Sequence, residues 1–292
     1  MTIMDLARRI DSPSPVRLHA PFVRLSGLVV VLLVLAAGSG LVLHPYAGET
    51  DFARNGYRGA DLVSLTVVLP LLVWATVAAR RGSGRGLLLW LGAIGYVAYQ
   101  YGYTFAYRWN RLFLVYLALL VLSAFSFAAA LISLNPRPLA GRFDRLTPTG
   151  VVSRFLLFVG VALGVMELAQ IVPTIFTGGT PQIVTDTGHP TSPVYVLDLG
   201  LVVPAMVLAG IWLRQRRPWG FIAAAVLLVK GATVGLGLLA GNLFAVLGDD
   251  KNDGPLVVLW AAIALGSAAV LWLFLRHLRD DVPPAVTHSD VP

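Results

Sequence analysis

Three ionisable residues lie within long apolar stretches of this 292-residue sequence. Lys230 stands in "AAAVLLVKGATVGLG", Glu167 in "FVGVALGVMELAQ" and Asp198 in "VYVLDLGLVVP". A charged side chain at membrane depth is costly, so such residues normally face a protein interior and pair with one another. One ammonium and two carboxylates have the chemistry to bind a charged substrate or to shuttle protons.

Polar residues at helical spacing accompany these charges. Gln170 follows Glu167 by three positions, and Tyr96 and Gln100 lie four positions apart on an earlier apolar stretch. We predict a polar pocket for a substrate or proton near the membrane midplane. Its expected lining residues are Lys230, Glu167, Asp198, Tyr96, Gln100 and Gln170. A purely structural ion pair between Lys230 and one carboxylate is the alternative.

The composition places these residues in a membrane protein. Of the 292 residues, 57% are hydrophobic and 13% are charged, and the mean hydropathy is +0.77. Soluble domains contain about 25% charged residues, whereas apolar runs of ~20 residues cross a bilayer as helices. The sequence therefore predicts an all-α fold, a polytopic membrane helix bundle. Eight transmembrane helices are expected, at about 24–43, 60–79, 86–107, 111–134, 152–173, 193–213, 219–247 and 255–276.

The arginines predict how the helices are oriented. Most of the 22 basic residues fall in alternate connections such as "RRGSGRG" (80–86) and "RQRRPWG" (214–220), whereas the loop 174–192 has none. Because cytoplasmic loops are enriched in Lys and Arg, both termini are expected to be cytoplasmic. The apolar run from Leu25 to Leu43 is longer than a signal-peptide core, so a retained first helix is expected.

The two halves of the chain resemble each other. "LTVVLPLLVWATVAARRGSGRG" aligns with "LGLVVPAMVLAGIWLRQRRPWG" at an offset of 134, so that Pro70 falls on Pro204. A later pair of segments aligns at an offset of 144. We predict two parallel four-helix repeats, with both prolines as candidate hinges, because proline kinks a helix. The expected parts are an N-terminal cytoplasmic segment (1–23), a first repeat (24–134), a cytoplasmic linker (135–151), a second repeat (152–276) and a cytoplasmic tail (277–292).

The composition also limits the possible chemistry. The absence of cysteine excludes disulfides, iron–sulfur clusters and Cys-ligated zinc. All five histidines lie outside the expected spans, so a haem held by two histidines between helices is not expected. The basic residues form no continuous face that would bind nucleic acid. No cofactor, metal site or catalytic residue is predicted, and the lipid bilayer is the expected partner.

Two stretches resemble known sequences. "NGYRGADLVSLTVVLPLLVWATVAARRGSGRGLLLWLGAIGYVAYQYGY" (55–103) and "VYVLDLGLVVPAMVLAGIWLRQRRPWGFIAAAVLLVKGA" (194–232) are similar to a group of bacterial multi-span membrane proteins with no assigned activity. The resemblance implies a multi-pass protein of the bacterial cytoplasmic (inner) membrane. It implies no mechanism and no functional residues.

The buried charges, the repeat and the paired prolines favour a transporter or permease-like protein for a small solute or ion over an enzyme. Two alternatives stay open. One is a membrane-embedded enzyme acting on a lipid or isoprenoid, with Asp198 or Glu167 as the acid–base group. The other is a non-catalytic sensor or assembly partner, whose function would depend on another protein.

Overall fold

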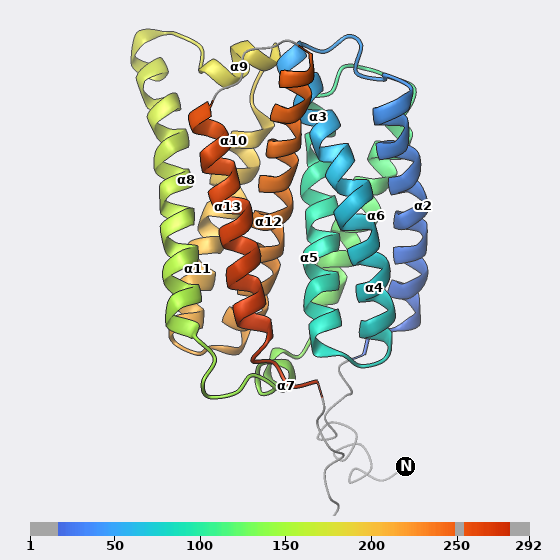
Figure 1. The fold of residues 1–292 in the computed structure, drawn as a ribbon, viewed down its shortest axis with the longest axis vertical. Coiled ribbons are helices and arrows are strands. Elements are labelled where there is room, and N and C mark those ends of the chain that lie inside the picture. The colour runs from blue at the N-terminus through green and yellow to red at the C-terminus, as the bar shows by residue number, and fades with distance from the viewer. Residues whose placement is uncertain (1–16, 249–253, 281–292) are drawn as a thin grey trace, which may run out of the picture.

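The fold is a bundle of roughly parallel and antiparallel helices (Figure 1). The computed structural model describes residues 17–248 and 254–280. Within these residues, the only β-type pairing is an isolated bridge between Phe143 and Leu278. The elements are α2 (Ala20–Val42), α3 (Asp51–Val63), η1 (Ser64–Val68), α4 (Leu69–Arg80), α5 (Gly84–Tyr101), η2 (Gly102–Phe105), α6 (Phe113–Ser133), α7 (Pro136–Ala140), α8 (Thr149–Thr177), α9 (Gln182–Thr187), α10 (Pro193–Leu197), η3 (Asp198–Val202), α11 (Val203–Arg214), α12 (Pro218–Leu247) and α13 (Gly254–Leu275).

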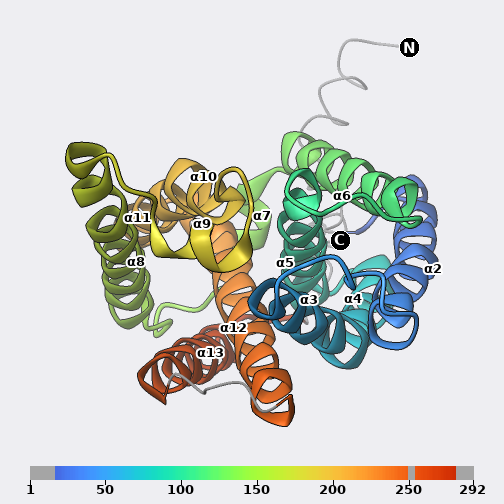
Figure 2. The ribbon, with the colours of Figure 1, turned by 90° about the horizontal axis from the view of Figure 1, so that it is seen from above.

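Seven helices of the described chain are long and apolar enough to cross a membrane. The prediction of an all-helical, multi-pass membrane protein is therefore confirmed. The run predicted at 86–107 forms α5, which lies among these seven helices but does not itself meet the length and hydropathy of a membrane span (Figure 2). Most of its residues are buried between other helices. Because the neighbouring helices cover it, α5 does not need the fully apolar surface that a lipid-facing helix requires.

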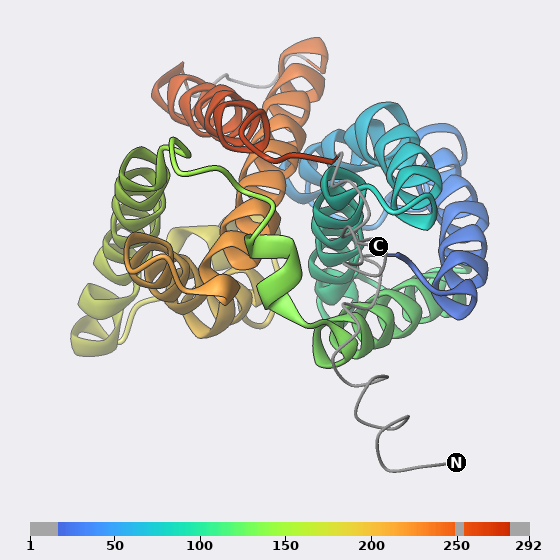
Figure 3. The same ribbon diagram turned by 90° about the horizontal axis from the view of Figure 1, so that it is seen from below.

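The bundle divides into two groups of helices (Figure 2). The first group contains α2 to α6, and the second contains α8 and α10 to α13. Helix α12 connects them, because it packs against α3 and α5 of the first group and against α11 and α13 of the second. The short helix α7 lies between the groups at one end and packs against α12 (Figure 3).

Both prolines predicted as hinges follow a π-helical turn. The segments η1 and η3 are each five residues long, and Pro70 and Pro204 are the second residues of the α-helices that follow them. In each case the residue before the proline donates its N–H to the carbonyl five residues earlier, at Ser64 or Asp198. The wider turn interrupts the regular ladder next to a residue that has no N–H to donate.

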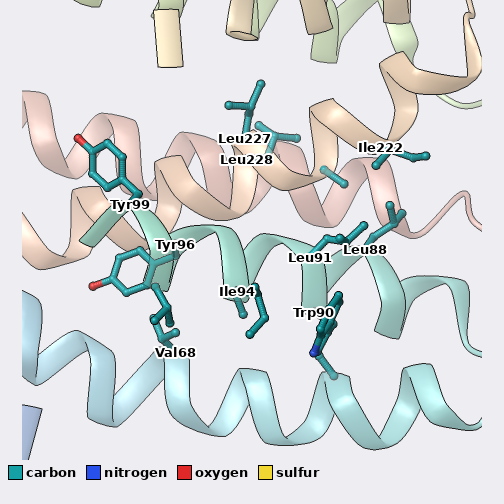
Figure 4. Close-up of a cluster of buried hydrophobic side chains, with 14 of the residues drawn as sticks. Val68, Leu88, Trp90, Leu91, Ile94, Tyr96, Tyr99, Ile222, Leu227 and Leu228 are labelled. Carbon is teal, nitrogen blue, oxygen red and sulfur yellow. The ribbon is translucent and has the colours of Figure 1, made fainter. Parts of the chain in front are cut away.

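Apolar packing around α5 joins the two groups (Figure 4). Leu88 and Leu91 of α5 lie in one cluster with Ile222 and Leu228 of α12, and these side chains are almost fully buried. Gly92 brings the helices close together, because a Cβ there would meet the Val229 side chain at 2.6 Å. This contact fixes α12, and with it Lys230, against the first group.

The end of the bundle that contains the turns before α5 and α12 is rich in arginine, and we call it the arginine-rich end. There the segment after α13 contacts the start of α5. Asp280 accepts hydrogen bonds from the Gly84 N–H at 2.7 Å and from the Ser83 hydroxyl at 3.0 Å. His277 contacts Asp144 of the connection between the two groups at 3.2 Å. The C-terminal end of the described chain therefore contacts both the first group and the connection that joins the two groups. The remaining parts of the predicted terminal segments, 1–16 and 281–292, lie outside the described residues, as does the loop 249–253.

Candidate functional site

Lys230 and Asp198 form an ion pair between α12 and η3. The Lys230 Nζ donates a hydrogen bond to Asp198 Oδ1 at 3.0 Å. Both residues are buried, with exposed fractions of 8% and 5%. Lys230 lies twelve residues after Pro218, or about 18 Å along α12, so the pair is far from the arginine-rich end.

Two tyrosines extend this ion pair into a hydrogen-bonded chain. The Tyr99 hydroxyl donates to the same Asp198 Oδ1 at 2.8 Å, and the Tyr103 hydroxyl donates to the Tyr99 oxygen at 2.7 Å. The Lys230 Nζ also lies 4.1 Å from the centre of the Tyr99 ring. The ring face attracts the ammonium, and the hydroxyl stabilises the carboxylate that balances it. Tyr99 therefore contacts both members of the pair.

Glu167 supplies a second carboxylate beside this pair. It is 2% exposed, and it interacts electrostatically with both Asp198 and Lys230. Its Oε2 is buried and has no hydrogen-bond partner in the described part of the chain. Gly164 allows α8 to approach closely, because a Cβ there would lie 3.2 Å from the Val203 side chain. We call Lys230, Asp198 and Glu167 the charged triad.

Of the six predicted lining residues, these three come together and the other three lie elsewhere. Tyr96 points away from α12, toward the helix that carries Val68 (Figure 4), and its hydroxyl lies 3.2 Å from the Ser64 hydroxyl. Gln170 is exposed on α8, where its Oε1 accepts a hydrogen bond from the Tyr195 hydroxyl at 3.2 Å. Gln100 is half-buried beside Tyr99.

The tyrosine of α5 that meets the triad is Tyr99 and not the predicted Tyr96. Tyr96 and Tyr99 are three positions apart on α5, and Figure 4 shows them directed to opposite neighbours, with Tyr99 toward α12. Helical spacing shows which residues share a broad face, but a broad face on a buried helix meets more than one neighbour. The spacing of Tyr99 and Tyr103, four positions apart, could have indicated which face of α5 meets the triad, because this i, i+4 pair forms the hydrogen bond there.

The charged triad is buried, with exposed fractions of 2% for Glu167, 5% for Asp198 and 8% for Lys230. The described chain has one cavity of about 70 Å³, lined by residues including Arg17, His19 and Phe22, and another of about 410 Å³, lined by residues including Arg85 and His277. Both lie at the arginine-rich end, away from the triad. No group of three or more His, Cys, Asp or Glu within the described ranges could hold a metal ion.

A second polar cluster closes the opposite end of the bundle. His189, in the loop before α10, lies with its Nε2 3.5 Å from Glu49 Oε2 and 3.2 Å from the Tyr57 hydroxyl. Glu49 and His189 are both buried. The Thr50 hydroxyl donates to the Asp186 carbonyl at 2.7 Å. These contacts hold the loop that contains α9 over the end of α3.

Comparison with known proteins identifies no relative. No protein-family model, no curated protein and no solved structure matches this chain. The buried charges and the helix geometry are therefore the basis for assigning a function.

Proposed function

We propose that the protein is a transporter for a proton or a small charged solute, and that the charged triad is its binding site. The observation that carries the proposal is the charge balance at the triad. Two carboxylates, Asp198 and Glu167, share one ammonium, Lys230, and all three are buried. A buried charge without a partner is strongly disfavoured, so the second carboxylate needs a proton or a bound cation.

The unpaired oxygen of Glu167 supports an exchangeable proton or solute. A purely structural ion pair needs one carboxylate for each ammonium, and Asp198 already occupies Lys230 at 3.0 Å. Glu167 adds an acceptor that the protein leaves unsatisfied within its described residues. A solute that brings one positive charge, or a proton, satisfies this group and restores neutrality.

The helix irregularity at Asp198 supports movement at the same place. Asp198 begins η3, and Pro204 follows this π-helical turn. Transporters commonly form their sites where membrane helices are interrupted near the midplane. A small change of η3 would move the Asp198 carboxylate relative to Lys230 and open the buried triad to one side.

Internal duplication is part of the proposal. Ser64 and Asp198 begin the two π-helical turns at positions 134 apart, and Tyr96 and Lys230 are also 134 apart. The Ser64–Tyr96 contact at 3.2 Å is therefore the counterpart of the Lys230–Asp198 contact at 3.0 Å. These matched pairs support two parallel four-helix repeats, in which only the second carries charge at this position.

We further propose eight membrane crossings, with α5 as the eighth, and cytoplasmic termini. Helix α5 runs beside the seven apolar helices (Figure 1). The turns before α5 and α12 contain Arg80, Arg81, Arg216 and Arg217, and the described termini reach the same end of the bundle through Leu18 and Asp280. Positive charge is enriched on the cytoplasmic side, which supports this orientation in a bacterial inner membrane.

Proteoliposomes that contain a pH-sensitive dye test the transport function. We expect wild-type protein to move protons when a pH gradient or a gradient of small charged solutes is applied, and Glu167→Gln to abolish this flux. Ser64→Ala is the matched control, because it alters the equivalent uncharged contact in the first group. Equal flux through wild type, Glu167→Gln and Lys230→Met would contradict the proposal and favour a scaffold or sensor.

A further inference from the structure

The first helix group contains a buried carboxylate that the charged triad does not use. Asp61 of α3 is 6% exposed, and its Oδ2 accepts a hydrogen bond from the Tyr46 hydroxyl at 2.8 Å. No ion pair within the described residues includes Asp61, and no positive group is among its electrostatic neighbours there. A buried carboxylate in a membrane protein normally faces a partner of opposite charge. This chain supplies none in the described part.

Tyrosines of the first group lie near this carboxylate, since Asp61 interacts electrostatically with Tyr46, Tyr101, Tyr107 and Tyr116. Tyr46 packs against Tyr57 at 5.3 Å between ring centres and against Tyr107 at 6.0 Å. Tyr116 packs against Tyr107 at 5.3 Å and against Tyr101 at 5.8 Å. We call these five residues the tyrosine cluster. The faces of such rings carry negative potential, which attracts a cation and repels an anion.

One hydroxyl of the tyrosine cluster is buried without a partner. Tyr116 is 1% exposed, and its hydroxyl makes no hydrogen bond within the described residues. It lies near the Tyr46 and Asn110 side chains, without the geometry of a full hydrogen bond, and close enough to Asp61 to interact with it electrostatically. An unsatisfied buried hydroxyl beside an unpaired carboxylate indicates a missing positive group that both oxygens would bind.

Tyr46 provides a further oxygen at this place. Burial, and next the nearby Asp61, raise the pKa of the Tyr46 hydroxyl well above its usual value. The hydroxyl therefore stays protonated and donates to Asp61, and its oxygen, which also lies near the Tyr116 side chain, keeps acceptor capacity that a cation can use.

The backbone of α2 closes the site. A Cβ at Gly40 would collide with the Asp61 carboxylate and would lie 3.0 Å from the Tyr46 hydroxyl. Glycine is thus needed for Asp61 to fold against α2 without displacement. The carboxylate is held inside the first group, on α3, and is separate from the triad on α8, η3 and α12.

We propose that Asp61 and the hydroxyls of Tyr46 and Tyr116 form a binding site for a small monovalent metal cation such as Na⁺ or K⁺. Carboxylate and hydroxyl oxygens are the ligands that hard cations prefer. A single positive charge neutralises Asp61, satisfies the Tyr116 oxygen and faces the tyrosine rings favourably. A divalent cation would leave one positive charge unbalanced, because the described residues provide one carboxylate here. This site goes beyond the proposed transport through the triad and does not depend on it.

Equilibrium binding of radioactive sodium to the full-length protein in detergent tests this site. The buffer base is N-methylglucamine at mildly alkaline pH, so that neither protons nor other small cations compete. We expect saturable binding to wild type, binding about tenfold weaker in Asp61→Asn, and a smaller loss in Tyr116→Phe, which keeps the ring. Gln170→Ala, on the exposed face of α8, is the control and should bind sodium like wild type, whereas Glu167→Gln shows whether the triad contributes to the binding. Competition with K⁺ and with trimethylammonium ranks the size that the site accepts.

The outcomes separate this site from the alternatives. Absence of saturable binding of Na⁺ and K⁺ to wild type would overturn the proposal, because Asp61 would then hold only a proton. Unchanged binding in Asp61→Asn would also overturn it. Loss of binding in Glu167→Gln with retention in Asp61→Asn would assign the ion to the triad instead. If Asp61→Asn does not fold, Tyr116→Phe decides, and unaltered affinity in that variant counts against the site.

Discussion

The ion pair at the triad predicts a specific pattern of stabilities when its partners are removed singly and together. Lys230→Met keeps a long unbranched side chain but removes the ammonium, which lies 3.0 Å from Asp198 and 4.1 Å from the Tyr99 ring centre. Two buried carboxylates are then left without a cation. Removal of one partner of a buried ion pair costs about 3–5 kcal/mol, because the other charge stays buried and unpaired. The free energy of unfolding is therefore expected to fall by about that amount.

Asp198→Asn gives the reciprocal case, and the double variant gives the control. In Lys230→Met/Asp198→Asn, neither charge of the pair remains, and replacement of a buried pair by neutral groups is often almost neutral in stability. The double variant should therefore be more stable than Lys230→Met alone. Unfolding of the purified protein in mixed detergent micelles, with the four proteins compared as a double-mutant cycle, measures the coupling. Additive losses, with the double variant the least stable, would refute this account of the pair.

Three further contacts give smaller predictions. His189→Ala removes the partner of Glu49 at 3.5 Å and of Tyr57 at 3.2 Å, so the free energy of unfolding should fall by about 1–3 kcal/mol. Hydrogen exchange of the backbone in 182–192 should become faster, and unchanged exchange would contradict the loop contact. Asp280→Ala removes the acceptor of the Gly84 N–H at 2.7 Å, and a helix cap of this kind stabilises the fold by about 1 kcal/mol. Thermal unfolding should detect this loss of stability, with Arg279→Ala as the control. Desolvation raises the pKa of Asp144, but the hydrogen bond and charge of His277 outweigh it and lower the pKa below its usual 3.8. The stabilising effect of Asp144 should therefore be complete above pH 3.8 and disappear as the pH falls below it, so the difference in unfolding temperature between wild type and Asp144→Asn should vanish only in acid.

The helical class and the positions of the helices could be predicted from apolar runs alone. Runs expected at 24–43, 152–173 and 219–247 correspond to α2, α8 and α12, with ends that differ by a few residues. Bilayer thickness and the need to satisfy every backbone group in lipid fix length and helicity so strongly that little else is required. Helix α8 is longer than expected, because it continues through Pro173 to Thr177.

The triad could be predicted in part, because charge is rare in apolar runs. Lys230, Glu167 and Asp198 were conspicuous for that reason. Their depth along each helix, at ~1.5 Å per residue, allowed them to meet. Which tyrosine meets them depends on how α5 is rotated between η1 and α12, and the spacing of Tyr96 and Gln100 does not fix this rotation.

Other features are not encoded in a local pattern. The π-helical turns before Pro70 and Pro204 were expected only as kinks, because one extra residue in a turn leaves no mark in hydropathy. The tyrosine cluster near Asp61 joins residues from 46 to 116, and its rings meet only after α3, α5 and α6 have packed with the connections next to them. Asp61, near the end of α3, is buried there although no local pattern in the sequence marks it.

Transport through the charged triad requires that the triad holds an exchangeable proton. Infrared spectroscopy of the protein in lipid detects the C=O stretch of a protonated carboxylic acid, and this band shifts on exchange into deuterated water. We expect such a band in wild type at neutral pH, its loss in Glu167→Gln and its retention in Asp61→Asn in sodium buffer. A spectrum without a protonated carboxyl band, or with a band that persists unchanged in Glu167→Gln, would contradict the assignment of the triad as the site of transport.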